Sequence, residues 1–385
     1  MHKKNIIQSF PDLEYLKIPE EKIVGRIKEL KVKYGKRIII LGHHYQRISI
    51  VELSDFRGDS LELARKAAEQ KDAEFIIFCG VNFMAESAAI LAQPHQKVIH
   101  PEMLAGCPMA DMAEYTDAEK AFREIEEISG KNSFVPITYI NSTAEIKAIC
   151  GKNNGIVCTS SNAKKIMQYA LEQNKSEKLD LHTPSAPQTP LSRGDFKVIF
   201  LPDRYLGSNT SNALGIPRNE IIVYTPKIDF GGNTKEKIKN AKVILWDGFC
   251  IIHKRFTVAH VKEAREKFPD AKIIVHPECI EEVVNLADAN GSTGYIVKYV
   301  QEASAGSTII IGTEINLVMR LANENPDKKI YPLAYSQCAN MYLINPHNLC
   351  WSLEHLGKIN VIEVPEEIKA DAKKALEKML YVSSI

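Results

Sequence analysis

Short apolar runs rich in Ile and Val recur along the chain, and each is followed by a segment with helical periodicity. The clearest runs span 37–44, 74–81, 134–141, 197–203, 242–248, 272–278 and 307–313. This alternation is typical of parallel β-α-β units. Because the runs are apolar at consecutive positions, they predict strands that are buried on both faces of their sheets. The feature therefore predicts an α/β protein built from parallel sheets.

The segments between these runs carry helix-start signals. A short polar residue followed three positions later by glutamate has the spacing of a capping box, and this predicts helix starts at Asp59, Thr116 and Ser142. Thr257 opens a further helix, and Pro365 precedes a closing amphipathic helix.

The length of 385 residues favours two or three domains. We place soft boundaries that give three αβα domains, at 1–104, 105–248 and 249–345. The C-terminal helix, within 346–385, is expected to pack back on the first domain. The second domain carries an insertion, in which the polar, Pro- and Ser-rich stretch 173–196 predicts a surface loop.

The charges of the chain nearly balance, with 49 Lys and Arg against 48 Asp and Glu and a formal net charge of +1. Such a balance gives no general basis for holding a polyanion, and without a local basic patch we expect no nucleic-acid partner. The N-terminus lacks the apolar core of a signal peptide, and no run approaches the roughly 18 apolar residues of a membrane span. We therefore expect a cytoplasmic protein with no membrane partner.

In a reducing compartment the eight cysteines point to burial, metal binding or catalysis and not to disulfides. No two of them have C-x-x-C spacing, so spacing alone indicates no metal site. Four are expected to be packing residues: Cys79, Cys150, Cys158 and Cys350. Cys279 has no assigned role. The remaining three differ because they follow small or loop-forming stretches: Cys107, Cys250 and Cys338.

Polar side chains follow several of the predicted strands. In open parallel sheets, ligands bind at the carboxyl ends of strands, where loops lead into helix N-termini. These positions hold His43, Tyr45, Ser60, Tyr139, Asn141, Ser160, His253, His276, Glu278, Ser292 and Thr293. Hydroxyls and backbone N–H groups at helix starts suit carboxylates and phosphates. Taken singly, the hydroxyl residues and Glu278 are equally compatible with ordinary helix caps, and the histidines with satisfied core residues.

Taken in order, these motifs resemble those of the quinolinate synthase family, iron-sulfur enzymes of NAD biosynthesis. The matching segments are LGHHYQ, GDSLELARKAA, VNFMAESAAIL, AGCPMADM, TYINSTAEIKA, CTSSNA, WDGFCIIHKRFT, VHPEC, GSTG, CANM and VPEEIKADAKKALEKML. Each motif is weak alone, but the ordered set covers nearly the whole chain.

The resemblance implies three similar αβα domains with parallel sheets around a pseudo-threefold axis, with the active site and a [4Fe-4S] cluster at the centre. By motif, the cluster ligands are Cys107, Cys250 and Cys338, one from each domain. Three protein ligands leave one iron open to act as a Lewis acid. The implied reaction condenses iminoaspartate with dihydroxyacetone phosphate to quinolinate, with loss of phosphate and water. L-aspartate oxidase is the implied supplier of iminoaspartate.

The resemblance also implies roles for the strand-end residues. The expected catalytic residues are Tyr45, Tyr139, His276 and Glu278, with Glu278 as the general base. The expected substrate-binding residues are His43, Ser60, Tyr139, Asn141, Ser160, His253, His276, Glu278, Ser292 and Thr293.

The chain departs from short members of the family at three places. His44 stands where they usually have Asn, Tyr342 stands where they often have Lys, and the span 161–246 is longer, as in the longer bacterial form. Three other functions stay open at this point. They are another hydro-lyase with a three-cysteine [4Fe-4S] cluster, a cluster-containing redox sensor, and a cofactor-free α/β enzyme with inert thiols.

Overall fold

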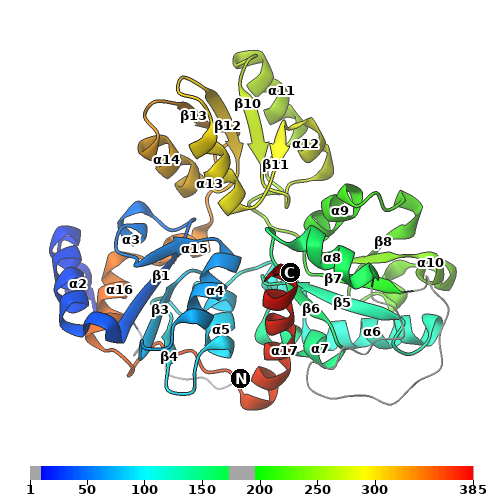
Figure 1. Cartoon of the computed structure of the whole chain (residues 1–385), viewed down its shortest axis with the longest axis horizontal. Coiled ribbons are helices and arrows are strands. Elements are labelled where there is room, and N and C mark those ends of the chain that lie inside the picture. Colours follow the sequence, from blue (N-terminus) through cyan, green and yellow to red (C-terminus); the bar gives the residue numbers. More distant parts are fainter. Residues whose placement is uncertain (1–9, 173–195, 385) are drawn as a thin grey trace.

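The computed structural model describes residues 10–172 and 196–384, and this part of the chain forms three parallel sheets. Figure 1 shows the sheets as three lobes around a common centre, each accompanied by helices. The predicted fold class, α/β with three similar αβα units, is therefore confirmed.

The first sheet has the strand order β2-β1-β3-β4. Its strands are β1 (Ile38–His43), β2 (Phe56–Gly58), β3 (Phe75–Cys79) and β4 (Lys97–Ile99). Its helices are α1 (Leu13–Leu16), α2 (Glu20–Tyr34), α3 (Ile48–Val51), α4 (Ser60–Glu69) and α5 (Asn82–Leu91). In β1, Ile38 and Ile40 pack with Ile27 of α2, whereas Ile39 and Leu41 pack with α4 and α5. Both faces of the strand are buried, as its unbroken apolar run predicts.

The second sheet has the order β6-β5-β7-β9-β8. Its strands are β5 (Phe134–Tyr139), β6 (Ile156–Cys158), β7 (Lys197–Leu201), β8 (Ile221–Tyr224) and β9 (Val243–Trp246). Its helices are α6 (Tyr115–Ser129), α7 (Ala144–Lys152), α8 (Ala163–Glu172), α9 (Arg204–Ala213) and α10 (Lys235–Asn240). Ile199 of β7 packs with Phe122 of α6, and Phe200 packs with Ile166 of α8. The surface loop expected at 173–196 falls almost wholly on 173–195, which lies outside the described residues.

The third sheet has the order β11-β10-β12-β13. Its strands are β10 (Lys272–Val275), β11 (Ala289–Asn290), β12 (Thr308–Gly312) and β13 (Lys329–Pro332). Its helices are α11 (Val258–Lys267), α12 (Glu281–Leu286), α13 (Thr293–Glu302) and α14 (Ile315–Glu324). Ile273 packs with Val261 of α11, and Ile274 packs with Ile296 of α13. The three sheets share one plan, in which the first strand lies between the second and the third, and β4, β9 or β13 lies beyond the third. The second sheet adds β8, which precedes β9 in the chain, at its outer edge.

The C-terminal region contains several helices where the sequence suggested one. After the short α15 (Ala339–Leu343), α16 (Pro346–Glu354) packs against α2, whereas α17 (Glu366–Ser384) lies mainly against α7 and β6 of the second lobe and also contacts α5. Figure 1 shows α17 between the first and second lobes. Its backbone comes so close to α7 that a Cβ at Gly151 would lie 1.9 Å from Asp371 O. No helix in the described part of the chain, α17 included, combines the length and apolar character needed to cross a membrane.

The helix-start predictions are confirmed at Asp59 and Thr257, which both form capping boxes. They are wrong at two other helices. Helix α6 begins two residues earlier than predicted, because its N-cap is Glu114 and not Thr116. Helix α7 is capped by Thr143. The Ser142 hydroxyl lies instead against the end of β5, where it accepts from Thr138 Oγ1 at 3.0 Å and donates to the carbonyl of Tyr139 at 2.8 Å.

Candidate functional site

The segments that follow the strands of all three sheets line one cavity between the lobes. It contains the sequence-predicted residues His43, Tyr45, Ser60, Tyr139, Asn141, Ser160, His253, His276, Glu278 and Thr293, together with Cys107, Cys250 and Cys338. Residues more than 200 positions apart thus meet because the carboxyl ends of parallel strands open on the same side of a sheet.

Ser292 is the predicted residue that the structure places differently. Its hydroxyl accepts the backbone N–H of Tyr295 at 3.3 Å and so caps α13. It lines a neighbouring cleft that also contains His44 and Arg57. The next residue, Thr293, turns into the central cavity.

Equivalent strands of the three sheets supply similar groups to the cavity. The first strands, β1, β5 and β10, are followed or ended by a histidine, a tyrosine and a histidine: His43, Tyr139 and His276. The second strands, β2, β6 and β11, are followed by hydroxyl residues at or near helix starts: Ser60, Ser160 and Thr293. The strands that pair with the third strand of each sheet on its outer side, β4, β9 and β13, are followed by the three cysteines: Cys107, Cys250 and Cys338.

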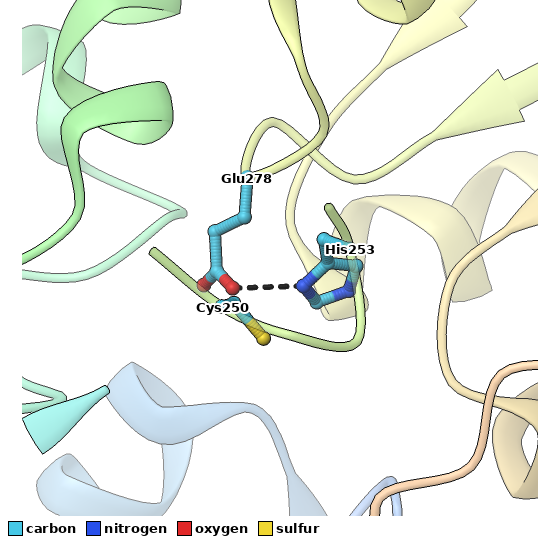
Figure 2. Close-up of side chains that lie close together, drawn as sticks. All are labelled: Cys250, His253 and Glu278. Carbon is cyan, nitrogen blue, oxygen red and sulfur yellow. Dashed lines mark hydrogen bonds and ion pairs between the residues drawn. The ribbon is translucent and has the colours of Figure 1, made fainter. Parts of the chain in front are cut away.

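Glu278 is fully surrounded by donors. The Tyr139 hydroxyl donates to its Oε1 at 2.5 Å, and His253 Nδ1 lies 2.8 Å from its Oε2. Figure 2 shows the carboxylate reaching toward His253, which shares a loop with Cys250. Burial alone would raise the pKa of Glu278, but the nearby His253 and His276 and the bond from Tyr139 outweigh burial and hold this pKa below its ordinary value. The carboxyl group is therefore ionised at neutral pH.

His43 and His276 are buried and neutral. Burial lowers the pKa of His43 to about 4 and that of His276 to about 3. Nδ1 of His43 faces the backbone N–H of Tyr45 at 3.1 Å, and Nδ1 of His276 faces the N–H of Glu278 at 3.3 Å. Because Nδ1 accepts in both rings, the proton is assigned to Nε2. Each ring is thus available as a neutral Nε2–H donor.

A hydroxyl network joins the first and third lobes beside these rings. The Tyr45 hydroxyl lies 2.8 Å from Thr313 Oγ1, which in turn lies 3.1 Å from His253 Nε2. Burial raises the pKa of Tyr45, and the negative charge of Glu278 raises it further. The pKa of Tyr139 is raised for the same reasons. Both phenols are therefore protonated and can donate.

Thr313 was missed by the sequence reasoning. It is the last residue of the apolar run 307–313 and directly follows β12, which ends at Gly312, so the rule that ligands bind after strands applies to it. Asn141 was predicted, and its Oδ1 is buried without a hydrogen-bond partner in the described structure. A buried acceptor of this kind is costly unless a ligand or water pairs with it. The cavity therefore offers an unpaired acceptor as well as several donors.

The thiols that line the cavity differ from the other cysteines. Cys107, Cys250 and Cys338 are partly exposed, whereas the other five are buried as packing residues usually are: Cys79, Cys150, Cys158, Cys279 and Cys350. Burial raises the pKa of Cys107 to about 12 and also raises the pKa values of Cys250 and Cys338. A bound metal ion ionises such thiols by replacing their protons. In addition, one ligand atom each of Cys250, His253 and Glu278 lie within 4.8 Å of one another. The donor set thus fits a metal cofactor.

Comparison with known proteins places the chain in a family. The family model described as quinolinate synthetase A protein matches residues 25–180 and 190–381. The chain belongs to the quinolinate synthase family. The resemblance that the ordered motifs indicated is therefore confirmed.

Curated quinolinate synthases are similar to this chain over almost its whole length. The protein of Corynebacterium glutamicum is 44% identical over 374 residues, which are 96% of this chain and 90% of the relative. That of Herpetosiphon aurantiacus is 44% identical over 381 residues, covering 96% and 95%. That of Bacillus subtilis is 42% identical over 378 residues, also covering 96% and 95%. The chain is thus an enzyme of the quinolinate synthase kind, and its central cavity is the candidate active site.

Proposed function

We propose that the chain is a quinolinate synthase, a transferase of NAD biosynthesis. It would condense iminoaspartate with dihydroxyacetone phosphate and release quinolinate, phosphate and water. One observation carries the proposal. A cysteine from each of the three lobes reaches the same cavity as Glu278, two protonated tyrosines and two neutral histidines.

We propose Cys107, Cys250 and Cys338 as the ligands of a [4Fe-4S] cluster. Thiolates are the usual ligands of such clusters, and these three are the cysteines of the described structure that line the cavity. When bound, the cluster supplies an open iron that polarises a carboxylate or hydroxyl of the substrate as a Lewis acid. The absence of C-x-x-C spacing is expected for ligands that come from separate lobes.

Substrate binding falls to the donors around the cavity. Two of the predicted hydroxyl residues, Ser60 at the start of α4 and Ser160 after β6, would hold substrate carboxylates together with the Nε2–H of His43. Asn141 would accept a donor of the substrate through its unpaired Oδ1. His253, His276 and Thr293 would face the phosphate and the ring-forming atoms. We retain Ser292 only as a residue that positions Thr293, since it caps the helix.

Proton transfer falls to Glu278 and the groups bonded to it. Glu278 is ionised and can take a proton from substrate carbon as the general base. Each of its oxygens accepts one hydrogen bond and keeps a second lone pair that can take the proton. Tyr139 is protonated and hydrogen-bonded to Glu278, so Tyr139 can donate a proton to a leaving hydroxyl. Tyr45 and His276 would serve as the further donors.

The test is quinolinate formation from iminoaspartate and dihydroxyacetone phosphate by anaerobically reconstituted protein. We expect product in amounts that scale with bound cluster. An intact cluster without product would favour another hydro-lyase, and reversible cluster oxidation without turnover would favour a redox sensor. Protein without stoichiometric iron and sulfide after reconstitution would overturn the cluster and favour a cofactor-free enzyme.

We also propose the domain division 1–104, 105–248 and 249–345, which gives each sheet its own domain. The first two boundaries fall between β4 and Cys107 and between β9 and Cys250, so these two cysteines lie on the connections that leave the first and second lobes. The cavity would then lie at the junction of the domains. Iminoaspartate hydrolyses readily in water, so a supplier such as L-aspartate oxidase is the proposed partner. Closure of the site during turnover would protect this reactive imine.

A further inference from the structure

The three loops that carry the lining cysteines are held by the same backbone hydrogen bond. In each lobe the third strand leads into a helix, and the first residue of that helix donates its N–H to the carbonyl two residues before the cysteine. The bonds are Asn82 to Ala105 at 2.8 Å, Arg204 to Gly248 at 2.9 Å and Ile315 to Ser336 at 2.8 Å. The cysteine loops are therefore repeats of one structural unit.

In the second lobe a buried carboxylate adds a bond to the cysteine itself. Asp203 is the N-cap of α9, and its Oδ1 accepts the N–H of Leu206 at 2.7 Å. Its Oδ2 accepts the backbone N–H of Cys250 at 3.1 Å. The side chain is 0% exposed. One carboxylate thus joins the helix start to the cysteine.

The third lobe repeats this arrangement with a glutamate at the same place. Glu314 is the N-cap of α14, and its Oε2 accepts the N–H of Asn316 at 2.8 Å. Its Oε1 accepts the backbone N–H of Cys338 at 3.2 Å. This side chain is also 0% exposed. The two carboxylates lie two residues beyond the ends of the equivalent strands β7 and β12.

The first lobe lacks the carboxylate. The equivalent N-cap position, two residues after β3, is Val81, whose side chain makes no cap bond. Its cysteine loop has a different support, since Asn340 Nδ2 of the third lobe donates to the carbonyl of Gly106 at 2.7 Å. Only the cysteine loops of the second and third lobes are therefore bonded to a carboxylate at this position.

Capping alone does not explain acidic residues at these two buried positions. Serine, threonine or asparagine caps a helix as well as a carboxylate does, and burying a carboxyl group costs free energy unless its oxygens are paired. Here the second oxygen of each group is paired with the cysteine N–H. We propose that Asp203 and Glu314 are positioning residues that fix Cys250 and Cys338 for cluster binding. The inference rests on the proposed function, because it takes these cysteines as ligands.

Serine variants separate the two roles of each carboxylate, which are to cap the helix and to accept the N–H of the cysteine. In Asp203→Ser and Glu314→Ser the hydroxyl can still cap the helix, but a single short side chain cannot also accept the N–H of the cysteine. The control is Asp288→Ser, because Asp288 Oδ2 also accepts a backbone N–H, that of Ile273 at 2.7 Å, but contacts no cysteine. Each protein is reconstituted anaerobically and assayed for iron and sulfide, thermal unfolding, iron loss to a chelator and the EPR spectrum of the reduced cluster.

We expect both test variants to lose iron faster than the wild type, by roughly 10- to 100-fold, the range seen when groups that orient metal ligands are removed. Their EPR spectra should change, whereas Asp288→Ser should lower the melting temperature and leave both cluster readouts unchanged. If a serine variant does not fold, Asp203→Asn or Glu314→Gln takes its place.

Iron loss within about twofold of the wild type, with an unchanged spectrum, in both test variants would overturn the inference and leave the proposed function intact. Equal acceleration in Asp288→Ser would also overturn it, because general destabilisation would then explain the effect. A wild-type protein that binds no cluster would overturn the proposed function and this inference together.

Discussion

Replacement of Glu278 by glutamine tests the centre of the proposed mechanism. The amide has the shape of the carboxyl group, so its oxygen can still accept from His253 Nδ1, now 2.8 Å from the carboxylate. Its NH₂ group can donate to the Tyr139 hydroxyl, which accepts as well as donates. The geometry of the site is therefore retained, while the negative charge and the proton acceptor are lost.

The magnitude follows from the role of a general base. Loss of such a base lowers turnover by roughly 10²- to 10⁴-fold, which is about 3–5 kcal/mol of transition-state stabilisation at 1.36 kcal/mol per factor of ten. Substrate affinity should change little, because Glu278 is paired with protein groups in the free site. The expected result is thus a fall in kcat with a nearly constant KM.

The assay is quinolinate formation by reconstituted Glu278→Gln protein, with cluster content measured on the same sample. Glu281→Gln is the matched control, since Glu281 begins α12, pairs with Arg218 at 2.6 Å and does not line the cavity. It should turn over like the wild type. Turnover of Glu278→Gln within about fivefold of the wild type, at equal cluster content, would refute the assignment of Glu278 as the base.

Three further outcomes are expected. Cys107→Ala should abolish retention of iron and sulfide. Cys79 lies in the buried core, so Cys79→Ala should retain both. Equal retention in the two variants would contradict the ligand assignment. Thr313→Val should lower kcat/KM by roughly tenfold, because Tyr45 loses a hydrogen-bond partner. Thr313→Ser keeps the hydroxyl and should keep kcat/KM near that of the wild type. Equal activity of the valine and serine variants would argue against the hydroxyl network. Burial lowers the pKa of His100 to about 4 in the folded state, so the unfolded chain, with a pKa near 6.5, binds this proton first as the pH falls. As the pH falls from 6.5 to 4, the free energy of unfolding should therefore decrease, by up to about 3 kcal/mol from this group. Denaturant titrations of His100→Gln over the same pH range should show a smaller decrease. An unchanged dependence of the free energy of unfolding on pH would exclude His100 as a cause.

The strands could be read from the sequence because of how parallel sheets are buried. Helices on both faces leave no solvent-facing side, so residues such as Ile38 to Leu41 are all apolar, and the runs stand out. Helix starts were less certain, because several polar residues compete for one cap. At α7 the adjacent Ser142 and Thr143 are both suitable. The structure has Thr143 as the cap, whereas the Ser142 hydroxyl is bonded to Thr138 and Tyr139 at the end of β5.

The candidate site could be predicted as a set of residues but not as an arrangement. The rule that ligands bind after strands pointed to His43, Tyr139 and Glu278, and the family resemblance added their roles. It could not distinguish Ser292 from Thr293, because a one-residue rotation at a helix start decides which hydroxyl caps α13 and which faces the cavity.

The amino-acid sequence alone established the α/β class, the family and the cysteines that differ from packing residues, because burial patterns and ordered motifs are local properties of a chain. The pairing of Glu278 with Tyr139 depended on the packing of two separate sheets. The bonds from buried carboxylates to Cys250 and Cys338 depended on which strand ends and loops become neighbours within one lobe. Local sequence patterns predict neither the pairing of Glu278 nor these carboxylate bonds. Hydrogen bonds between segments far apart in the chain depend on distances that only the assembled sheets define.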